Sequence, residues 1–222
     1  MSTLCFISEN MERVLYLTWE HIWIVGSSLV IAMIIGIPLG VLITRHKNLA
    51  QRVLNTANVL MTIPSIALFG IMLPILAVMG FGLGKLPAVI ALVLYSQLPI
   101  IRNTYTAILN VPPAVTDAGR GMGMNRWRLL REVEIPLAVP VILAGLRTAA
   151  VMNIGIAAIA AYIGAGGLGV LISQGISRTY EEMIIAGAVL VSLLAIIVDG
   201  AMALLERWVT PRGLQVQRRQ NG

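Results

Sequence analysis

The chain has few charged and few aromatic residues. Of its 222 residues, 12% are charged, 5% are aromatic and 58% are hydrophobic. Soluble domains usually carry about a quarter of charged residues, and a soluble chain of this length could not bury so much apolar surface in one core. Lipid tails, in contrast, solvate apolar side chains all around a helix. The composition therefore excludes an ordinary soluble domain and indicates an integral membrane protein.

Cysteine is nearly absent, because Cys5 is the only one in the chain. One cysteine forms no intrachain disulfide, and without a CxxC pair or a Cys/His cluster we expect no bound metal. The Gly-x-x-x-x-Gly-Lys-Ser/Thr phosphate loop is also missing, so we expect neither an ATP site nor a cofactor. His21 and His46 both lie at predicted helix ends, and the apolar segments hold no nucleophile–base pair. These absences argue against an enzyme.

Five segments reach the roughly 20 mostly apolar residues that a membrane-spanning helix needs. They run from about 22 to 43, 54 to 79, 86 to 109, 137 to 163 and 183 to 205. Pro64 and Pro74 interrupt the second segment, where neighbouring helices can satisfy the freed carbonyl groups. The stretch before Trp19 suits a surface helix or a short additional one. We expect an all-α membrane protein that forms a single domain over residues 1–222.

Lysine and arginine divide unevenly between the two sides of these spans. One side holds Arg45, Lys47, Arg52, Arg102, Arg120, Arg126, Arg128, Arg131, Arg207, Arg212, Arg218 and Arg219. The other side holds Arg13, Lys85 and Arg178, whereas Arg147 lies inside a span. Because cytoplasmic segments carry the basic excess, we expect the N-terminus outside and a C-terminal tail of about residues 208–222 in the cytoplasm. The same rule explains the net charge of +6 without nucleic-acid binding.

Residues 110–136 form a polar segment that is too long for a simple turn. Apolar residues recur in it at helical spacing, and Gly123 supplies a tight turn between two short helices. Pro136 suits the first turn of the next span. A helix–turn–helix on the cytoplasmic face fits a groove on a soluble partner, although a surface helix anchored by Trp127 explains the same pattern. A second polar segment, 164–182, begins with glycines and predicts an irregular entry followed by a short helix through residues 171–173.

Polar residues within the predicted spans are further candidates. Arg147 and Asp199 lie at similar depths, roughly 16 Å and roughly 12 Å from the ends of their spans at 1.5 Å per residue. We therefore expect them to pair, although separate backbone or subunit partners would also satisfy them. Asn153 suits either the lining of a transport path or a hydrogen bond between helices. Pro64 and Ser65 form a kink that suits either a gate or a packing bend.

The 110–136 segment resembles the coupling loop of permease subunits in ATP-binding-cassette importers. That pattern is Glu-Ala-Ala, three residues, Gly, and a Leu-Pro or Ile-Pro pair about a dozen residues later. This chain has Asp117-Ala118-Gly119, Gly123 and Ile135-Pro136, and so departs from the pattern at Asp117 and Gly119. Both changes keep the chemistry of a carboxylate and a small residue. The resemblance implies contact with an ATPase through Asp117, Ala118, Gly119, Gly123, Arg126 and Pro136.

Four other stretches, 62–70, 98–105, 144–149 and 162–169, resemble permeases for glycine betaine, carnitine, choline and related osmoprotectants. The resemblance implies a type I importer permease with a MetI-like fold. It also implies three partners: a cytoplasmic subunit that binds and hydrolyses ATP, an extracytoplasmic substrate-binding protein, and a second permease subunit, identical or related. A permease for another small solute such as methionine is an alternative, and so is a secondary transporter, although we find no convincing inverted repeat.

Overall fold

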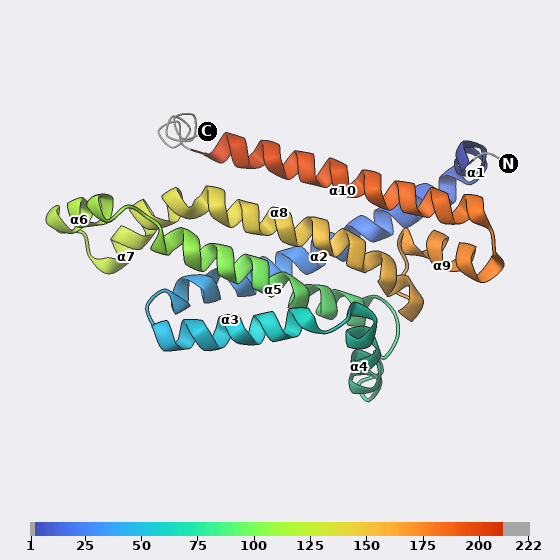
Figure 1. Ribbon diagram of the computed structural model, residues 1–222, viewed down its shortest axis with the longest axis horizontal. Coiled ribbons are helices and arrows are strands. Elements are labelled where there is room, and N and C mark those ends of the chain that lie inside the picture. Colours follow the sequence, from blue (N-terminus) through green and yellow to red (C-terminus); the bar gives the residue numbers. More distant parts are fainter. Residues whose placement is uncertain (1–2, 211–222) are drawn as a thin grey trace.

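The computed structural model describes residues 3–210, and the regular elements in that part of the chain are all helices, with no strand. Figure 1 shows an elongated bundle in which the long helices run back and forth between two ends. The elements are α1 (Thr3–Glu9), α2 (Met11–Ile43), α3 (Lys47–Thr62), α4 (Ser65–Ala77), α5 (Lys85–Leu109), α6 (Pro113–Gly121), α7 (Arg126–Leu129), the π-helical η1 (Leu130–Glu134), α8 (Ile135–Ile159), the 3-10 helix η2 (Ala160–Ile163), α9 (Gly169–Arg178) and α10 (Glu181–Val209).

Four of the five predicted spans correspond to long apolar helices in α2, α5, α8 and α10. Helix α2 begins at Met11, well before the predicted start near residue 22, because Val14, Leu17 and His21 continue its buried face at helical spacing. The short additional helix predicted before Trp19 is α1, which lies edge-on to Tyr180 through Phe6, with 5.6 Å between the ring centroids.

The second predicted span is not one continuous helix. Residues 47–77 instead form α3 and α4, which meet at an angle of 99°. Pro64 sterically forces the residue before it out of the helical region, so Ile63 is extended with ψ of 127°. Pro74, by contrast, lies inside α4 without ending it. The described chain thus has four helices long enough to cross a membrane, or five if the bent pair counts as one span.

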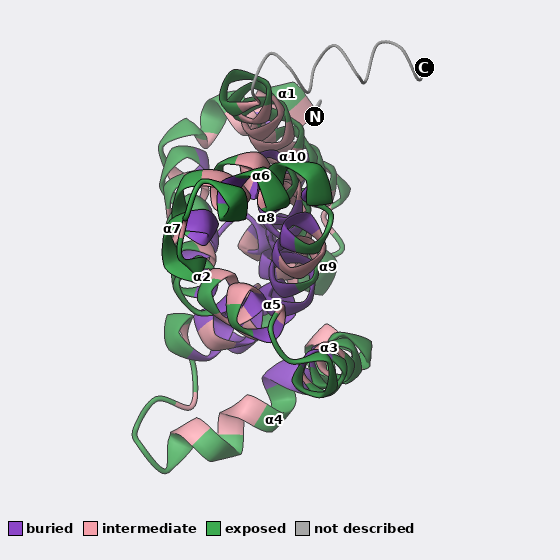
Figure 2. Cartoon of the chain, turned by 90° about the vertical axis from the view of Figure 1, so that its left-hand side faces the viewer, coloured by how far each residue is buried: buried purple, intermediate pink, exposed green. Residues whose placement is uncertain are grey.

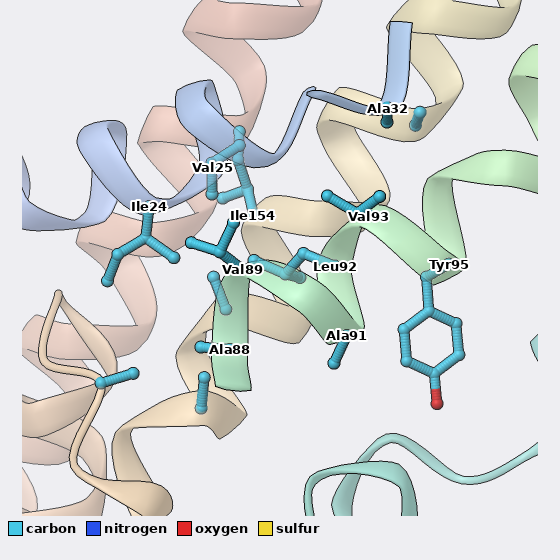
Figure 3. Close-up of a cluster of buried hydrophobic side chains, with 14 of the residues drawn as sticks. Ile24, Val25, Ala32, Ala88, Val89, Ala91, Leu92, Val93, Tyr95 and Ile154 are labelled. Carbon is cyan, nitrogen blue, oxygen red and sulfur yellow. The ribbon is translucent and has the colours of Figure 1, made fainter. Parts of the chain in front are cut away.

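The core lies where α2, α5 and α8 pack together, and α5 is the most buried of the three. Figure 3 shows Ile24 of α2, Leu92 of α5 and Ile154 of α8 in this cluster. A small residue lets two of the backbones approach closely: a Cβ atom on Gly40 of α2 would lie 2.6 Å from the Cβ atom of Thr104 on α5. Such small-residue contacts are the usual way for helices to pack within a membrane.

The two ends of the bundle correspond to the two sides predicted from the basic residues. The α2–α3 turn, the helices α6 and α7 and the last turn of α10 lie at one end, and α1, α9 and the α4–α5 connection lie at the other (Figure 1). We call these the α6 end and the α9 end. The second polar segment, 164–182, forms the predicted irregular, glycine-rich entry followed by a short helix, α9. Residues 211–222, which include most of the predicted tail, lie outside the described residues.

Candidate functional site

The 110–136 segment forms the predicted short helix, turn and second helix. Helix α6 ends in a turn in which Gly123 has a φ of +78°. The Gly123 N–H donates to the Arg120 carbonyl at 2.9 Å, and the Met124 N–H donates to the Gly119 carbonyl at 3.1 Å. This pair of bonds closes the C-terminus of a helix and requires a left-handed residue, which is normally glycine. Gly123 is therefore needed for the backbone conformation of the turn.

A second set of contacts fixes α6 against α7. The Asn125 side chain caps α7 by accepting a hydrogen bond from the Arg128 N–H at 2.8 Å. Gly119 is buried, and a Cβ atom there would lie 2.6 Å from the Cδ1 atom of Leu129. The glycine at the second alanine of the coupling pattern therefore allows α6 to approach α7 closely. Leu130 is buried against α5 and α8 and anchors the segment to the bundle.

The outer face of the segment is open. Asp117, Ala118 and Arg126 are exposed, as are Met122 at 72% and Trp127 at 66% of their surfaces. Figure 2 looks onto this end of the bundle and shows α6 and α7 largely exposed. Apolar side chains among charged ones at an exposed end are typical of a surface that contacts another protein.

Pro136 lies in the first turn of α8, as predicted, but α8 is not separate from the short helix before it. The helix is continuous from Arg126 to Ile163 and passes through the π-helical turn Leu130–Glu134 just before the proline. Proline lacks an N–H and its ring collides with the carbonyl of the fourth residue before it, so a wider turn relieves the clash. One rod therefore joins the exposed segment to the transmembrane region.

Arg147 and Asp199 form the predicted pair. The Arg147 Nε atom donates to Asp199 Oδ1 at 2.5 Å, and a terminal guanidinium nitrogen donates to Oδ2 at 2.6 Å. Glu206 adds a carboxylate oxygen 3.9 Å from the other terminal nitrogen. Such a two-point contact orients both side chains. The pair links α8 to α10 beside a groove lined by Ala144, Thr148, Val151 and Met152, and its side chains stay 35% and 40% exposed.

Residues 23–211 match the family described as the binding-protein-dependent transport system inner membrane component. The chain belongs to this family. It is 53% identical to the osmoprotectant import permease protein OsmW of Salmonella typhimurium, over 97% of this chain and all of the relative. It is 46% identical to the glycine betaine/carnitine/choline transport system permease protein OpuCB of Bacillus subtilis, over 95% of this chain and 94% of the relative.

The fold agrees with this assignment. A structure of the MetNI methionine ABC transporter in inward-facing conformations superposes with a TM-score of 0.81 and 26% identity, covering 91% of this chain and 99% of the other. The chain is therefore an all-helical, multi-pass inner-membrane permease subunit with the MetI-like fold of type I importers.

Asn153 joins three helices of the permease. Its Nδ2 atom, on α8, donates to Ser96 Oγ on α5 at 2.8 Å and to Ser28 Oγ on α2 at 3.3 Å. All three side chains are fully buried. Of the two roles considered from the sequence, this geometry favours the hydrogen bond between helices over the lining of a path.

A polar contact at the α9 end was missed from the sequence. Glu20 Oε2 accepts a hydrogen bond from the Gly167 N–H at 2.8 Å, and Glu20 Oε1 pairs with Lys85 Nζ at 2.7 Å. The Lys85 ammonium also lies 5.9 Å from the ring centroid of Trp23, within the range of a cation–π attraction. Glu20, on α2, thereby contacts both the glycine-rich loop before α9 and the first residue of α5.

His21 completes this contact from the interior. Its Nδ1 atom accepts from the Leu168 N–H at 3.2 Å, and its Nε2 atom lies 3.1 Å from the Ile154 carbonyl oxygen. Because a carbonyl only accepts, Nε2 carries the proton and the ring is neutral in this arrangement. The sequence predicts His21 at a helix end because the apolar run begins only at about residue 22, whereas α2 begins at Met11. A correct start would have shown adjacent Glu and His residues inside a membrane helix.

Pro64 and Ser65 lie at the bend between α3 and α4, where Pro64 is exposed and Ser65 half-buried. The Tyr95 hydroxyl donates to the Ile63 carbonyl at 2.6 Å. A carbonyl that the bend releases from helical bonding thus has a partner on a neighbouring helix, as expected for a proline break in a membrane protein.

Proposed function

We propose that this permease forms the pore of an ATP-driven importer for quaternary ammonium osmoprotectants of the glycine betaine, carnitine and choline type. The observation that carries this proposal is the 53% identity, over 97% of the chain, to a permease named for osmoprotectant import. A second relative named for glycine betaine, carnitine and choline, 46% identical over 95% of the chain, supports the same solute class.

Substrate capture is assigned to a separate extracytoplasmic binding protein. A quaternary ammonium group offers no hydrogen-bond donor and is held by the faces of several aromatic rings. Only 5% of this chain is aromatic. Tyr95 hydrogen-bonds to the backbone of Ile63, and Tyr162, on η2, is more than half exposed. This distribution supports a conduit that receives the solute rather than a high-affinity cage.

The ATP hydrolysis that drives transport is assigned to a separate cytoplasmic ATPase that contacts the 110–136 segment. The exposed face of this segment carries the polar and small groups of Asp117, Ala118 and Arg126. Gly119 allows α6 to pack closely on α7, and Gly123 allows the turn between them. Pro136 follows the π-turn in the rod that runs from Arg126 to Ile163. Closure of the ATPase pair would displace α6 and α7, and the rod would carry that displacement into the transmembrane region.

The topology follows from this assignment. The α6 end, which carries most of the basic residues, faces the cytoplasm, and the α9 end faces the binding protein. The N-terminus is outside and the C-terminus is cytoplasmic. A second permease subunit, identical or related, completes the pore.

The first experiment is purification of the tagged chain with its associated proteins, followed by reconstitution with the binding protein and ATP. We expect a soluble ATPase to co-purify, and we expect ATP-dependent uptake of labelled glycine betaine, carnitine or choline that stops when the binding protein is left out. Uptake of methionine but none of these three solutes would contradict the substrate class. Uptake driven by an ion gradient without ATP would instead indicate a secondary transporter.

A further inference from the structure

Helix α3 carries a stripe of neutral polar side chains. Gln51, Asn55, Asn58 and Thr62 recur at intervals of four, three and four residues, so they share one helix face, and all four are exposed. We call these residues the α3 stripe. The Gln51 side-chain amide donates to the Asn55 carbonyl oxygen at 3.0 Å, which aligns two members of the stripe.

The other side of α3 packs on the bundle. Its buried residues are Ala50 and Ala57, and Ala50 clusters with Ile43 and Ile101. Apolar side chains such as Val59 and Met61 flank the stripe. The polar residues therefore occupy the face that points away from α5.

The direction of α3 excludes a helix that rests on the membrane surface. Figure 1 shows α3 beside α5 and parallel to the long axis of the bundle, whereas α4 lies across that axis. Thr62 is the last residue of the sixteen-residue helix that begins at Lys47, a rise of roughly 22 Å. The stripe therefore extends from the α6 end deep into the membrane region.

Lipid is a poor neighbour for this face. An amide placed in hydrocarbon without a partner loses the hydrogen bonds that it makes in water, at substantial cost. Polar side chains within membrane spans accordingly face the protein interior or a water-filled cavity. The α10 helix shows the contrasting pattern, because its exposed residues near mid-span, such as Ile196 and Ile197, are apolar.

We propose that the α3 stripe lines the water-filled path through which the solute crosses the membrane. This inference rests on the proposed transport function. The amides offer donors to a carboxylate, and the amide and hydroxyl oxygens offer partial negative charge to a quaternary ammonium, yet none of these groups carries a net charge; the Thr62 hydroxyl itself donates to the Val59 carbonyl at 2.7 Å. A conducting path needs contacts that are favourable enough for entry and weak enough for release. Neutral dipoles meet both needs for a zwitterion, whereas a fixed charge would retain the opposite end of the solute.

The test uses the low cysteine content of the chain. Cys5→Ser removes the only cysteine, and Asn55→Cys, Asn58→Cys and Thr62→Cys are then introduced one at a time. Ile196→Cys on α10, at a side chain that is 68% exposed, is the matched control. The probe is a methanethiosulfonate bearing a trimethylammonium group, which reacts with thiolates in water and resembles the solute. Labelling rates are measured in nanodiscs, and uptake is measured in proteoliposomes that hold the complete importer.

We expect Asn58→Cys and Thr62→Cys to react about tenfold faster than Ile196→Cys, because thiolate forms only where water has access. We also expect the attached group to lower uptake about tenfold at the stripe positions, since it obstructs a path that must pass the solute. Asn55→Cys gives a further position if one of the deeper variants folds poorly.

Equal labelling rates on α3 and α10 would overturn the inference, and so would fast labelling that leaves uptake unchanged. These failures differ from failure of the proposed function, because the Cys5→Ser parent must itself transport an osmoprotectant. If the parent transports none, the function fails while the labelling rates still report whether water reaches the stripe.

Discussion

The turn at Gly123 allows the sharpest test of the 110–136 segment. Gly123 has a φ of +78°, and no heavy atom lies within 4 Å of the position that a Cβ atom would occupy. Gly123→Ala therefore adds no steric clash with the surroundings and costs only the backbone strain of a left-handed L-residue, about 1–2 kcal/mol. That cost lowers the ratio of closed to open turn by a factor of about 5 to 30.

Gly121 supplies the matched control two residues away. A Cβ atom at Gly121 also meets nothing within 4 Å, but this residue lies within α6 and has no positive φ. Gly121→Ala should therefore leave the turn closed and favour α6 by up to about 1 kcal/mol of helix propensity. Gly123→Asn should fall between the two, because asparagine tolerates the left-handed region better than alanine.

Hydrogen exchange measures the effect directly. The Gly123 and Met124 amides donate to the Arg120 and Gly119 carbonyls, so their exchange should accelerate about 5- to 30-fold in Gly123→Ala and not in Gly121→Ala. Equal exchange in the two variants would refute the strain argument.

Gly123→Asp should abolish coupled uptake while the protein stays in the membrane. Normal substrate-stimulated ATPase activity in that variant would refute the coupling role.

Three further predictions concern polar contacts between the helices. Arg147→Ala and Asp199→Ala should each lower the amount of folded protein in a detergent-unfolding series. The double variant should lose less folded protein than the sum of the two single losses. Additive losses would contradict an interaction between the two side chains. Asn153→Ala should lower the free energy of unfolding by about 1–2 kcal/mol, since it removes two hydrogen bonds and leaves a small cavity. Ser28→Ala removes only the longer bond and should lower it less in the same titration. Glu20→Ala should accelerate hydrogen exchange at Gly167 more than Glu20→Gln, whose amide oxygen still accepts that bond; equal rates would show that the loop does not depend on residue 20.

Much of the fold could be predicted because bilayer constraints act on long segments. For the four spans in α2, α5, α8 and α10, most ends lie within a few residues of the predicted positions, because an apolar run of sufficient length has few alternatives in lipid. The start of α2 is the exception. The depth argument for Arg147 and Asp199 succeeded for the same reason. Both residues lie on long helices, and the ends from which their depths were counted lie close to the predicted positions, so their distances along the bundle could be compared.

The errors arose where a proline or a helix start decided the geometry. The effects of Pro64 and Pro74 differ although both interrupt the same apolar run, because only Pro64 coincides with a residue that becomes extended. The π-turn before Pro136 could not be predicted, because a proline in the first turn of a span is equally compatible with an ordinary helix start. Because the predicted start of α2 was late, His21 was not recognised as a residue inside a helix. Its partners Leu168 and Ile154 are far away in sequence, and only the packing of the helices brings them next to it.

The distribution of the polar contacts suggests which parts of the permease move together. Asn153 joins α8 to α2 and α5, and His21 joins α2 to the Ile154 carbonyl of α8. Helices α2 and α5 and the rod, which contains α8, therefore form one block. The Arg147–Asp199 pair adds α10 to that block. Helix α3 meets it through apolar contacts that include Ala50, Val53 and Leu54, and the Tyr95–Ile63 hydrogen bond holds the residue that follows α3. Packed helices can slide past one another by small amounts, so we expect a displacement of the rod to change the distance between the block and α3. The α3 stripe is the exposed polar face of this helix, which is where a path that opens and closes needs its lining.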